Sequence, residues 1–143
     1  MGIRVASIDD LELLVSMGKK FLDASPYAKL SDDAFIMQYA SEFLSNPDPL
    51  KHVALLYDDQ GVIGGKAERF PWGHVFRAYE LMWWVEPEAR SKGVGQELIE
   101  AFEYWAKQVG CKEIVMVGLD DRTCQFYEKN GYSLYERGYV KEL

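Results

Sequence analysis

The hydrophobic pattern of the chain is strongest between Glu80 and Val109. Residues 79–85 form an aromatic and branched run of strand length. Pro87 ends this run, and after a polar stretch apolar residues recur at steps of three and four, which is typical of one apolar stripe on a helix. The stripe consists of Val94, Leu98, Phe102, Trp105 and Val109. With Gly110 placed to end the helix in a left-handed conformation, the pattern predicts a strand, a turn and a helix.

The N-terminal part of the chain predicts a strand followed by two helices. A short strand covers residues 3–6, and residues 7–10 cap a first helix that is ended by Ser25-Pro26. A second helix begins at residues 31–33 and stops at Asn46-Pro47. These two helices and their joining loop form one unit.

A hairpin is predicted before the central unit. Residues 53–57 read as a buried strand, a turn follows, and residues 62–69 read as the returning strand. A loop at residues 70–74 then leads into the strand at residues 79–85.

The C-terminal part predicts one more strand, a helix and a short hairpin. Residues 113–117 form an apolar strand, and Asp120 caps a short helix that stops at Gly131. Residues 132–136 and 139–143 are expected to pair as a last hairpin.

The order of these elements predicts a single domain over residues 1–143 of the α/β (α+β) class, with a mixed, mostly antiparallel sheet and helices on both faces. A net charge of −7 argues against nucleic acid and against an anionic membrane surface as partners. No apolar run approaches the ~20 residues of a membrane span, and the start of the chain lacks the apolar core of a signal peptide, so we expect a cytoplasmic protein. Cys111 and Cys124 lack metal-type spacing, so free thiols are expected and no metal site is predicted.

The polar stretch between the central strand and helix carries the most specific chemistry. From Arg90 to Gln96 it reads Arg-Ser-Lys-Gly-Val-Gly-Gln. The first backbone N–H groups of a helix have no partner within the helix and form an anion site. Gly93 and Gly95 lack Cβ atoms, so a phosphate can approach closely, while Arg90 and Lys92 add positive charge. A pyrophosphate is the natural guest, and an ordinary tight turn that uses glycine for its dihedral angles is the alternative.

Two other phosphate motifs are excluded by the sequence. The stretch lacks the Gly-Lys-Ser/Thr of a nucleotide P-loop, and the third glycine of the dinucleotide fingerprint is replaced by Leu98. The stretch instead resembles motif A of the GCN5-related N-acetyltransferase (GNAT) superfamily, Arg/Gln-x-x-Gly-x-Gly/Ala, with Arg90, Gly93 and Gly95 at the motif positions. Residues 120–132 resemble motif B of the same superfamily and end in Phe-Tyr-Glu-Lys-Asn-Gly-Tyr.

This resemblance implies acyl transfer from acetyl-coenzyme A (acetyl-CoA) to an amine by direct attack. It also implies a GNAT fold whose sheet is splayed in the middle, with the pantetheine arm of the cofactor between the strands that end at Val85 and Val117. The main chain of Trp84 and Val85 would bind the pantetheine, and the amides of residues 91–96 would bind the pyrophosphate. The full implied set of cofactor-binding residues is Trp84, Val85, Arg90, Ser91, Lys92, Gly93, Val94, Gly95, Gln96 and Asp120.

The resemblance also implies the catalytic residues. Tyr127 matches the acid tyrosine of the family, which protonates the leaving thiolate; its alternative is a core tyrosine on an amphipathic helix. Glu80 stands at the entrance of the strand that feeds the active site, where several family members carry a glutamate base, and its alternative is a surface carboxylate at a strand end. Glu68 and His74 are the other candidates for the base, His74 because imidazole titrates near neutrality.

The sequence departs from the family pattern in four places. Asp120 stands where asparagine is usual and Thr123 where alanine is usual, so the helix cap is kept but the resemblance no longer implies the side-chain contact that the asparagine makes to the cofactor arm. Ser91 replaces a glycine of the turn, and the final hairpin is short, so any substrate wall built from it should be reduced. An apolar pocket for the acceptor amine could be formed by Trp72, Trp83 and Trp84; the alternative is that these residues belong to the core.

Three functions from different classes fit these residues: an amine acetyltransferase, a catalytically inactive acyl-CoA-binding sensor or interaction module of the same fold, and a structural domain that binds no cofactor. An intact Tyr127 and the glycine turn favour the first over the second. The sequence does not name the amine, since small polyamines, aminoglycosides, lysine side chains and protein N-termini all fit an acidic acetyltransferase. The expected partners are thus a small-molecule or protein amine, and a homodimer is compatible with the resembled family.

Overall fold

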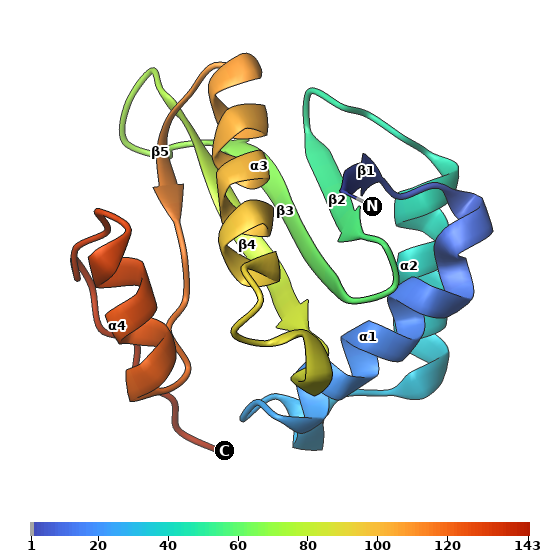
Figure 1. Ribbon diagram of the computed structural model, residues 1–143. Helices are drawn as coiled ribbons and strands as arrows, with labels where there is room; N and C mark the ends of the chain where they lie inside the picture. Colours follow the sequence, from blue (N-terminus) through green and yellow to red (C-terminus); the bar gives the residue numbers. More distant parts are fainter. Residues whose placement is uncertain (1) are drawn as a thin grey trace.

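The chain is built around a sheet whose strands lie side by side in the order of the sequence (Figure 1). The computed structural model describes residues 2–143 and contains β1 (Ile3–Val5), β2 (His52–Tyr57), β3 (Gly61–Arg69), β4 (Phe76–Val85) and β5 (Cys111–Val115). Neighbouring strands from β1 to β4 are antiparallel, whereas β5 pairs with β4 in parallel. The mixed, mostly antiparallel sheet predicted from the sequence is confirmed.

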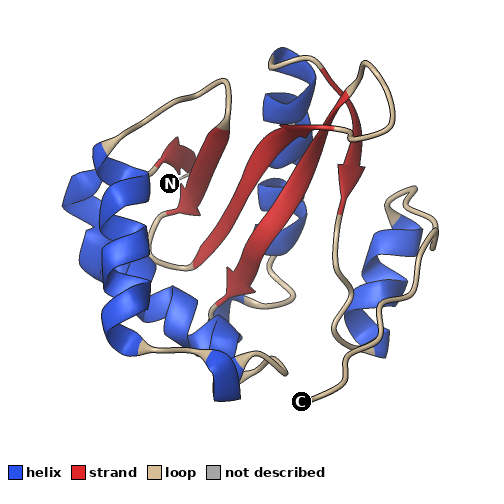
Figure 2. Ribbon diagram, turned by 180° about the vertical axis from the view of Figure 1, so that it is seen from behind, coloured by secondary structure: helices blue, strands red, loops and turns tan. Residues whose placement is uncertain are grey.

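Helices cover both faces of this sheet (Figure 2). They are α1 (Leu11–Asp23), α2 (Asp33–Ser45), α3 (Val94–Gln108) and α4 (Asp121–Lys129), with short 3-10 helices η1 (Ile8–Asp10), η2 (Ala28–Leu30) and η3 (Pro87–Ala89). α1 and α2 pack on one face, and α3 packs on the other. Within residues 2–143, none of the helices combines the length and the apolar composition that crossing a bilayer requires.

The sheet separates two apolar cores because successive strand residues point to opposite faces. In β2, Leu55 packs under α3, whereas its neighbour Leu56 packs against α1 and α2. The apolar stripe predicted for α3 is confirmed, with Leu98 and Phe102 fully buried. Gly110 follows α3 with a φ of 87°, the left-handed conformation predicted for it.

The predicted ends of the first helix need small corrections. The capping segment after Ser7 forms the 3-10 turn η1, so α1 begins only at Leu11, and α1 already ends at Asp23, before Ser25-Pro26. The second helix begins within the predicted residues 31–33, and Asp32 caps it: its carboxylate accepts the backbone N–H of Phe35 at 2.8 Å.

The short hairpin predicted at the end of the chain is wrong, because residues 132–143 form no strand. A two-stranded hairpin is stable only when it packs an apolar face against the rest of the protein. Here Tyr139 and Val140 are 91% and 92% exposed. The tail instead runs back along α4 toward η2, where Glu142 forms an ion pair with Lys29 (Figure 1).

A bulge interrupts β4 opposite β3. Gly64 pairs with Met82 and Gly65 pairs with Glu80, so Leu81 has no partner in β3. The extra residue breaks the alternation of side chains, and both Leu81 and Met82 line the face of the sheet that carries α1 and α2.

Candidate active site

β4 and β5 separate part-way along β4. Their parallel pairing ends where Tyr79 lies opposite Val115, and β4 continues to Val85 paired with β3 alone. The two chains diverge beyond this point (Figure 1). The predicted splay is present. β5 ends at Val115 and not at the predicted Val117, because the N–H and C=O groups of Val117 form hydrogen bonds with side chains.

Glu80 and Tyr127 meet at Val117 inside this splay. Glu80 is the first β4 residue beyond the pairing, and its Oε1 accepts the backbone N–H of Val117 at 3.3 Å. Tyr127 reaches in from α4, and its hydroxyl donates to the carbonyl oxygen of Val117 at 3.4 Å. The two side chains assigned to catalysis from the sequence thus flank one residue, held there by three separate segments of the chain.

The Glu80 carboxyl is partly buried. Burial raises its pKa to about 7, although the hydrogen bond from the Val117 N–H acts in the opposite direction. A carboxyl with this pKa is divided between its two forms near neutral pH, which is the condition in which a general base works best.

Tyr127 is almost completely buried and packs between aromatic rings. The centroid of its ring lies 5.6 Å from that of Trp83 and 5.7 Å from that of Tyr132. Burial raises the pKa of the Tyr127 hydroxyl, and the nearby Glu80 carboxylate raises it further, so the hydroxyl keeps its proton at neutral pH. Its bond to Val117 is long for an O–H···O contact, which leaves the proton available to a closer acceptor. Tyr127 is therefore a core residue whose hydroxyl stays protonated at neutral pH.

The turn before α3 presents unpaired backbone donors. Ser91 and Gly93 have positive φ angles of 69° and 86°, and a Cβ added at Gly93 would meet nothing within 4 Å. None of the backbone N–H groups from Ser91 to Gln96 has an acceptor in good hydrogen-bond geometry within residues 2–143, and the first that has one is Glu97, which donates to the Gly93 carbonyl at 3.0 Å. With Lys92 exposed beside them, these donors lie at the positive end of the α3 dipole, a position that favours negative charge.

A protein-family model matches the part of the chain that contains this site. The model of the Acetyltransferase (GNAT) family matches residues 15–132, which include the splay, the donor turn, Glu80 and Tyr127. This protein belongs to the GNAT acetyltransferase family. No curated protein matches the chain.

Solved structures share the GNAT fold over the whole chain. An acetyltransferase from Trypanosoma brucei is 19% identical with a TM-score of 0.76, and the match covers 99% of this chain and 98% of that one. A ribosomal-protein-alanine N-acetyltransferase from Brucella melitensis is 17% identical with a TM-score of 0.74, with both chains covered fully (100%). A GNAT family acetyltransferase from Staphylococcus aureus is 21% identical with a TM-score of 0.72, again with 100% coverage of both chains. At these identities the likeness concerns the fold.

The two glycines of the GNAT turn have different tasks. The open space at Gly93 leaves room for an anion, as predicted. A Cβ added at Gly95 would instead lie 3.1 Å from Cζ2 of Trp83, so Gly95 lets α3 approach the tryptophan ring. The prediction that both glycines make room for a phosphate is therefore corrected for Gly95.

Arg90 supports the GNAT turn from within the protein. Its Nε donates to the Val85 carbonyl at 3.0 Å, and its guanidinium lies 4.8 Å from the centroid of the Trp84 ring. The indole of Trp84 donates to the buried Glu86, which also accepts from Lys20 of α1. Although burial acts to raise it, these hydrogen bonds hold the pKa of Glu86 below its ordinary value. The sequence analysis assigned both Arg90 and Val85 to cofactor binding. In the structure the Arg90 side chain and the Val85 carbonyl are hydrogen-bonded to each other.

Asp120 and Gln96 also have structural partners. The carboxylate of Asp120 accepts the backbone N–H of Thr123 at 2.7 Å, which caps α4 as predicted and lowers the pKa of Asp120. Nε2 of Gln96 donates to Oδ1 of Asn130 at 2.7 Å and ties the start of α3 to the end of α4. A ligand in the turn would therefore meet the backbone of Gln96, because its side chain is engaged.

The other base candidates have partners away from Val117. Glu68 forms an ion pair with Lys66 at 2.7 Å, and both residues are on β3. Nδ1 of His74 lies 3.0 Å from the guanidinium of Arg69 in an exposed loop. Of the three candidates, Glu80 is the one that the structure places beside Tyr127.

The three tryptophans do not form one pocket. Trp72 is 85% exposed in the loop after β3. Trp83 packs in the core under α3, while Trp84 packs on the opposite face near α1. Consecutive strand residues point to opposite faces of the sheet, so these tryptophans cannot line one pocket and that interpretation is wrong. Trp83 and Trp84 are core residues instead.

Two features of the site were missed in the sequence. The backbone of Val117 contacts both side chains that the resemblance assigns to catalysis, and an apolar residue at the end of a strand gives no sign of such a contact. The pair of Lys20 and Glu86 joins residues that lie 66 positions apart. The only local sign of the role of Val117 was Gly118, which directly follows the apolar run.

Proposed function

We propose that this protein transfers the acetyl group of acetyl-CoA to a primary amine by direct attack of the amine nitrogen. The observation that carries the proposal is the convergence of Glu80 and Tyr127 on Val117 inside the splay. A group that can accept a proton and a group that can donate one thus stand at one place. The donor turn follows the end of the same strand, β4.

The donor turn fits the pyrophosphate of coenzyme A. Residues 91–96 offer their unpaired N–H groups at a helix start, which is the arrangement that binds phosphate without a dedicated side chain. The edge of β4 beyond Tyr79 has no strand partner on the β5 side and would bind the amides of the pantetheine arm. When bound, acetyl-CoA supplies the acetyl group as a reactive thioester.

Glu80 prepares the amine. At pH 7 about half of the Glu80 carboxyls are ionised, because the pKa is about 7. The carboxylate attracts an incoming ammonium group and removes one proton from its nitrogen. The nitrogen then has the free lone pair that attack requires, and the proton resides on a Glu80 oxygen.

Tyr127 stabilises the departing sulfur. Its pKa lies far above the ordinary thiol value of ~8.5, so complete proton transfer from the hydroxyl is unfavourable. The hydroxyl therefore acts mainly by donating a hydrogen bond to the negative charge that develops on sulfur, and the second proton that the attacking nitrogen loses converts the thiolate to the thiol. This physical limit places the contribution of Tyr127 at the lower end of the range for a general acid.

A catalytically inactive acyl-CoA-binding module is the less favoured function. Such a module would need the donor turn but neither a base nor an acid. The presence of Glu80 and Tyr127 at one residue of the splay favours the enzyme.

The proposal also covers the class of acceptor, the cellular compartment and the oligomeric state. A net charge of −7 favours a cationic acceptor, either a small-molecule amine or an amine of a protein, over nucleic acid. Cys111 and Cys124 are free thiols, which accords with a reducing compartment such as the cytoplasm. A homodimer is compatible with the proposal but not required by it.

Acetyl-CoA should stabilise the folded protein. A ligand present at 100 times its dissociation constant stabilises the folded state by about 2.7 kcal/mol, so a thermal-shift experiment should show a clear rise in Tm. Release of the thiol in the presence of a panel of amines then tests for transfer. A Tm that does not respond to millimolar acetyl-CoA would rule out the cofactor and, with it, the proposed reaction.

Glu80 should control the pH dependence of the rate. We expect kcat/KM to rise with pH up to about 7 and to level off above it, because the ionised Glu80 is the base. Glu80→Gln should abolish this rising limb and lower kcat/KM by ~10² to 10⁴-fold. Glu68→Gln removes a carboxyl from an exposed ion pair and serves as the control, with an unchanged profile. A rising limb that persists in Glu80→Gln would assign the base to another group.

The same substitution should change how stability depends on pH. The pKa of Glu80 is raised from 4.5 to about 7 on folding, so its contribution to stability is complete below pH ~4.5 and is lost as the pH rises through ~7. Glu80→Gln cannot ionise, and its Tm relative to wild type should rise between these pH values. A difference in Tm that is constant across this range would contradict a carboxyl desolvated by folding.

A further inference from the structure

A pair of hydrogen-bonded side chains joins the donor turn to the helix that carries Tyr127. Gln96 is the third residue of α3, and its Nε2 donates to Oδ1 of Asn130 at 2.7 Å. Asn130 directly follows α4, which ends at Lys129. Both side chains of the pair are half-buried. The turn proposed to bind the pyrophosphate is thus bonded to the helix that supplies Tyr127.

The partners of the two amides determine how they are oriented. Nδ2 of Asn130 donates to the carbonyl of Phe126 at 2.8 Å, and a carbonyl oxygen can only accept. Oδ1 of Asn130 therefore faces Gln96, which has to present its NH₂ group. Because rotation of either amide by half a turn would break a hydrogen bond, the pair has one favoured arrangement.

Asn130 holds the last turn of α4, where Tyr127 lies. Its backbone N–H is shared between the carbonyls of Phe126 and Tyr127, at 3.2 and 2.9 Å, and its side chain also bonds to Phe126. α4 has only nine residues, and a helix this short depends on contacts with the rest of the protein to stay in place. The bond from Gln96 is such a contact, and it reaches the turn of Tyr127 through a single residue.

Packing links the same two parts of the site. A Cβ added at Gly95 would lie 3.1 Å from Cζ2 of Trp83, so the tryptophan ring lies against the start of α3. The centroid of this ring is 5.6 Å from that of Tyr127 and 5.2 Å from that of Phe126. Apolar packing is not directional, whereas a hydrogen bond is. The bond from Gln96 therefore adds a directional contact to the packed rings.

The Tyr127 hydroxyl depends on this support. Its own hydrogen bond to the Val117 carbonyl is 3.4 Å long, too long to fix the position of the oxygen. The backbone of α4 and the packed ring place the hydroxyl instead. In the proposed reaction it has to meet the sulfur of a cofactor held at the donor turn, and a misplacement of about 1 Å can lower a rate by ~10²-fold.

We propose that Gln96 and Asn130 are positioning residues, which keep the Tyr127 hydroxyl aligned with a cofactor bound at the donor turn. This inference rests on the proposed acetyl transfer. Neither side chain is assigned a contact with the reacting atoms: Gln96 acts through Asn130, and Asn130 acts through the last turn of α4. Since the backbone N–H of Gln96 belongs to the donor turn, one residue connects the anion-binding backbone with the placement of Tyr127.

Gln96→Met tests the pair. Methionine is close to glutamine in length and in helix propensity, so it should keep the packing of α3 while it removes the donor to Asn130. We expect kcat to fall by ~10-fold, because the Tyr127 hydroxyl is then less well placed. The affinity for coenzyme A, measured by titration calorimetry, should stay close to that of wild type, because the backbone N–H of residue 96 is kept.

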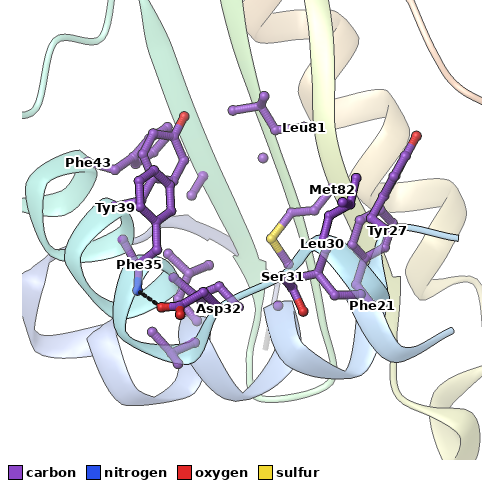
Figure 3. Close-up of a pocket in the computed structure, with 18 residues that line it drawn as sticks. Phe21, Tyr27, Leu30, Ser31, Asp32, Phe35, Tyr39, Phe43, Leu81 and Met82 are labelled. Atoms are coloured by element: carbon purple, nitrogen blue, oxygen red, sulfur yellow. Dashed lines mark hydrogen bonds between the residues drawn. The ribbon is translucent and has the colours of Figure 1, made fainter. Parts of the chain in front are cut away.

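Gln38→Met is the matched control. Nε2 of Gln38 donates to Glu42 at 3.2 Å within α2, so the substitution also removes a side-chain hydrogen bond from a helix. α2 packs on the other face of the sheet, where its residues Phe35, Tyr39 and Phe43 line an apolar cavity (Figure 3). Gln38→Met should therefore leave kcat unchanged.

A double-mutant cycle separates positioning from stability. If Gln96 acts through the Tyr127 hydroxyl, Gln96→Met should lower kcat ~10-fold in wild type and have no further effect in Tyr127→Phe. A residue that only stabilises the fold would lower the Tm and change kcat by the same factor in both backgrounds. Asn130→Ala removes the same bond from the other side and should reproduce the result.

Fluorine NMR of fluorotyrosine-labelled protein adds a measurement without turnover. The Tyr127 signal is the one that Tyr127→Phe lacks; Gln96→Met should shift it, and Gln38→Met should not. An unchanged kcat, equal kcat losses with and without the hydroxyl, or an unmoved Tyr127 signal overturns the inference while acetyl transfer stands. If no amine is acetylated, the proposed function fails, and the fluorine signal alone decides whether the pair positions Tyr127: a shift in Gln96→Met supports this, and no shift overturns it.

Discussion

Tyr127→Phe should lower turnover about 10²-fold while the protein still folds and still binds coenzyme A. Phenylalanine keeps the ring packed against Trp83 and Tyr132 and removes the hydroxyl that reaches Val117 at 3.4 Å. Because that hydrogen bond is long, its loss should cost at most on the order of 1 kcal/mol of stability. The measurement is the steady-state rate with an identified amine beside the Tm of the same variant.

Tyr132→Phe is the matched control for this prediction. The Tyr132 hydroxyl donates to Glu103 at 2.8 Å, and its ring packs against Tyr127. Removal of this hydroxyl should lower the Tm with little effect on turnover, which is the opposite pattern. A correctly folded Tyr127→Phe protein that turns over at the wild-type rate would show that Tyr127 is a core residue without a role as acid.

Gly93→Asp should abolish binding of coenzyme A at ordinary concentrations. The carboxylate would stand at the donor turn where the pyrophosphate is proposed to bind. Two like charges about 4 Å apart near a protein surface repel by about 4 kcal/mol, which corresponds to a ~10³-fold loss of affinity. Titration calorimetry with coenzyme A measures this loss.

The fold should survive this substitution. The added Cβ meets nothing within 4 Å, and the cost of a positive φ at a non-glycine residue is roughly 1–2 kcal/mol. Gly110→Asp is the control, because Gly110 has nearly the same φ of 87°, is equally open and lies at the other end of α3. It should carry a similar strain and bind coenzyme A normally. If Gly93→Asp binds coenzyme A with unchanged affinity, the turn does not bind the pyrophosphate. If both variants lose affinity equally, backbone strain explains the loss.

The elements with a strong period could be predicted from the sequence. The stripe from Val94 to Phe102 repeats at the helical period and is buried in α3, and the Asp32 and Asp120 caps lie where their side chains indicate. The tail could not be predicted in the same way. Tyr139 and Val140 have the β-propensity of a strand, but that propensity decides nothing when no face of the sheet receives the side chains.

The site was predictable where a motif carries the chemistry. Tyr127 and the turn at Gly93 belong to such motifs; in the structure the Tyr127 hydroxyl reaches Val117 and the turn directly precedes α3. Gly95 has the same letter in the motif, yet its contact with Trp83 comes from packing between distant segments. The bulge at Leu81 likewise depends on its register with β3, so it had no signal in the sequence.

The central claim is that Glu80 and Tyr127 together promote acetyl transfer to an amine in the splay. Mass-spectrometric detection of the N-acetylated product, with parallel measurement of thiol release, tests it most directly. The wild-type protein, given acetyl-CoA and a panel of primary amines, should form one amide for each thiol released, whereas a Glu80→Gln/Tyr127→Phe protein should bind acetyl-CoA and form no amide above the uncatalysed rate. A wild-type protein that binds acetyl-CoA but acetylates no amine, or a double variant that keeps the wild-type rate, would contradict the claim.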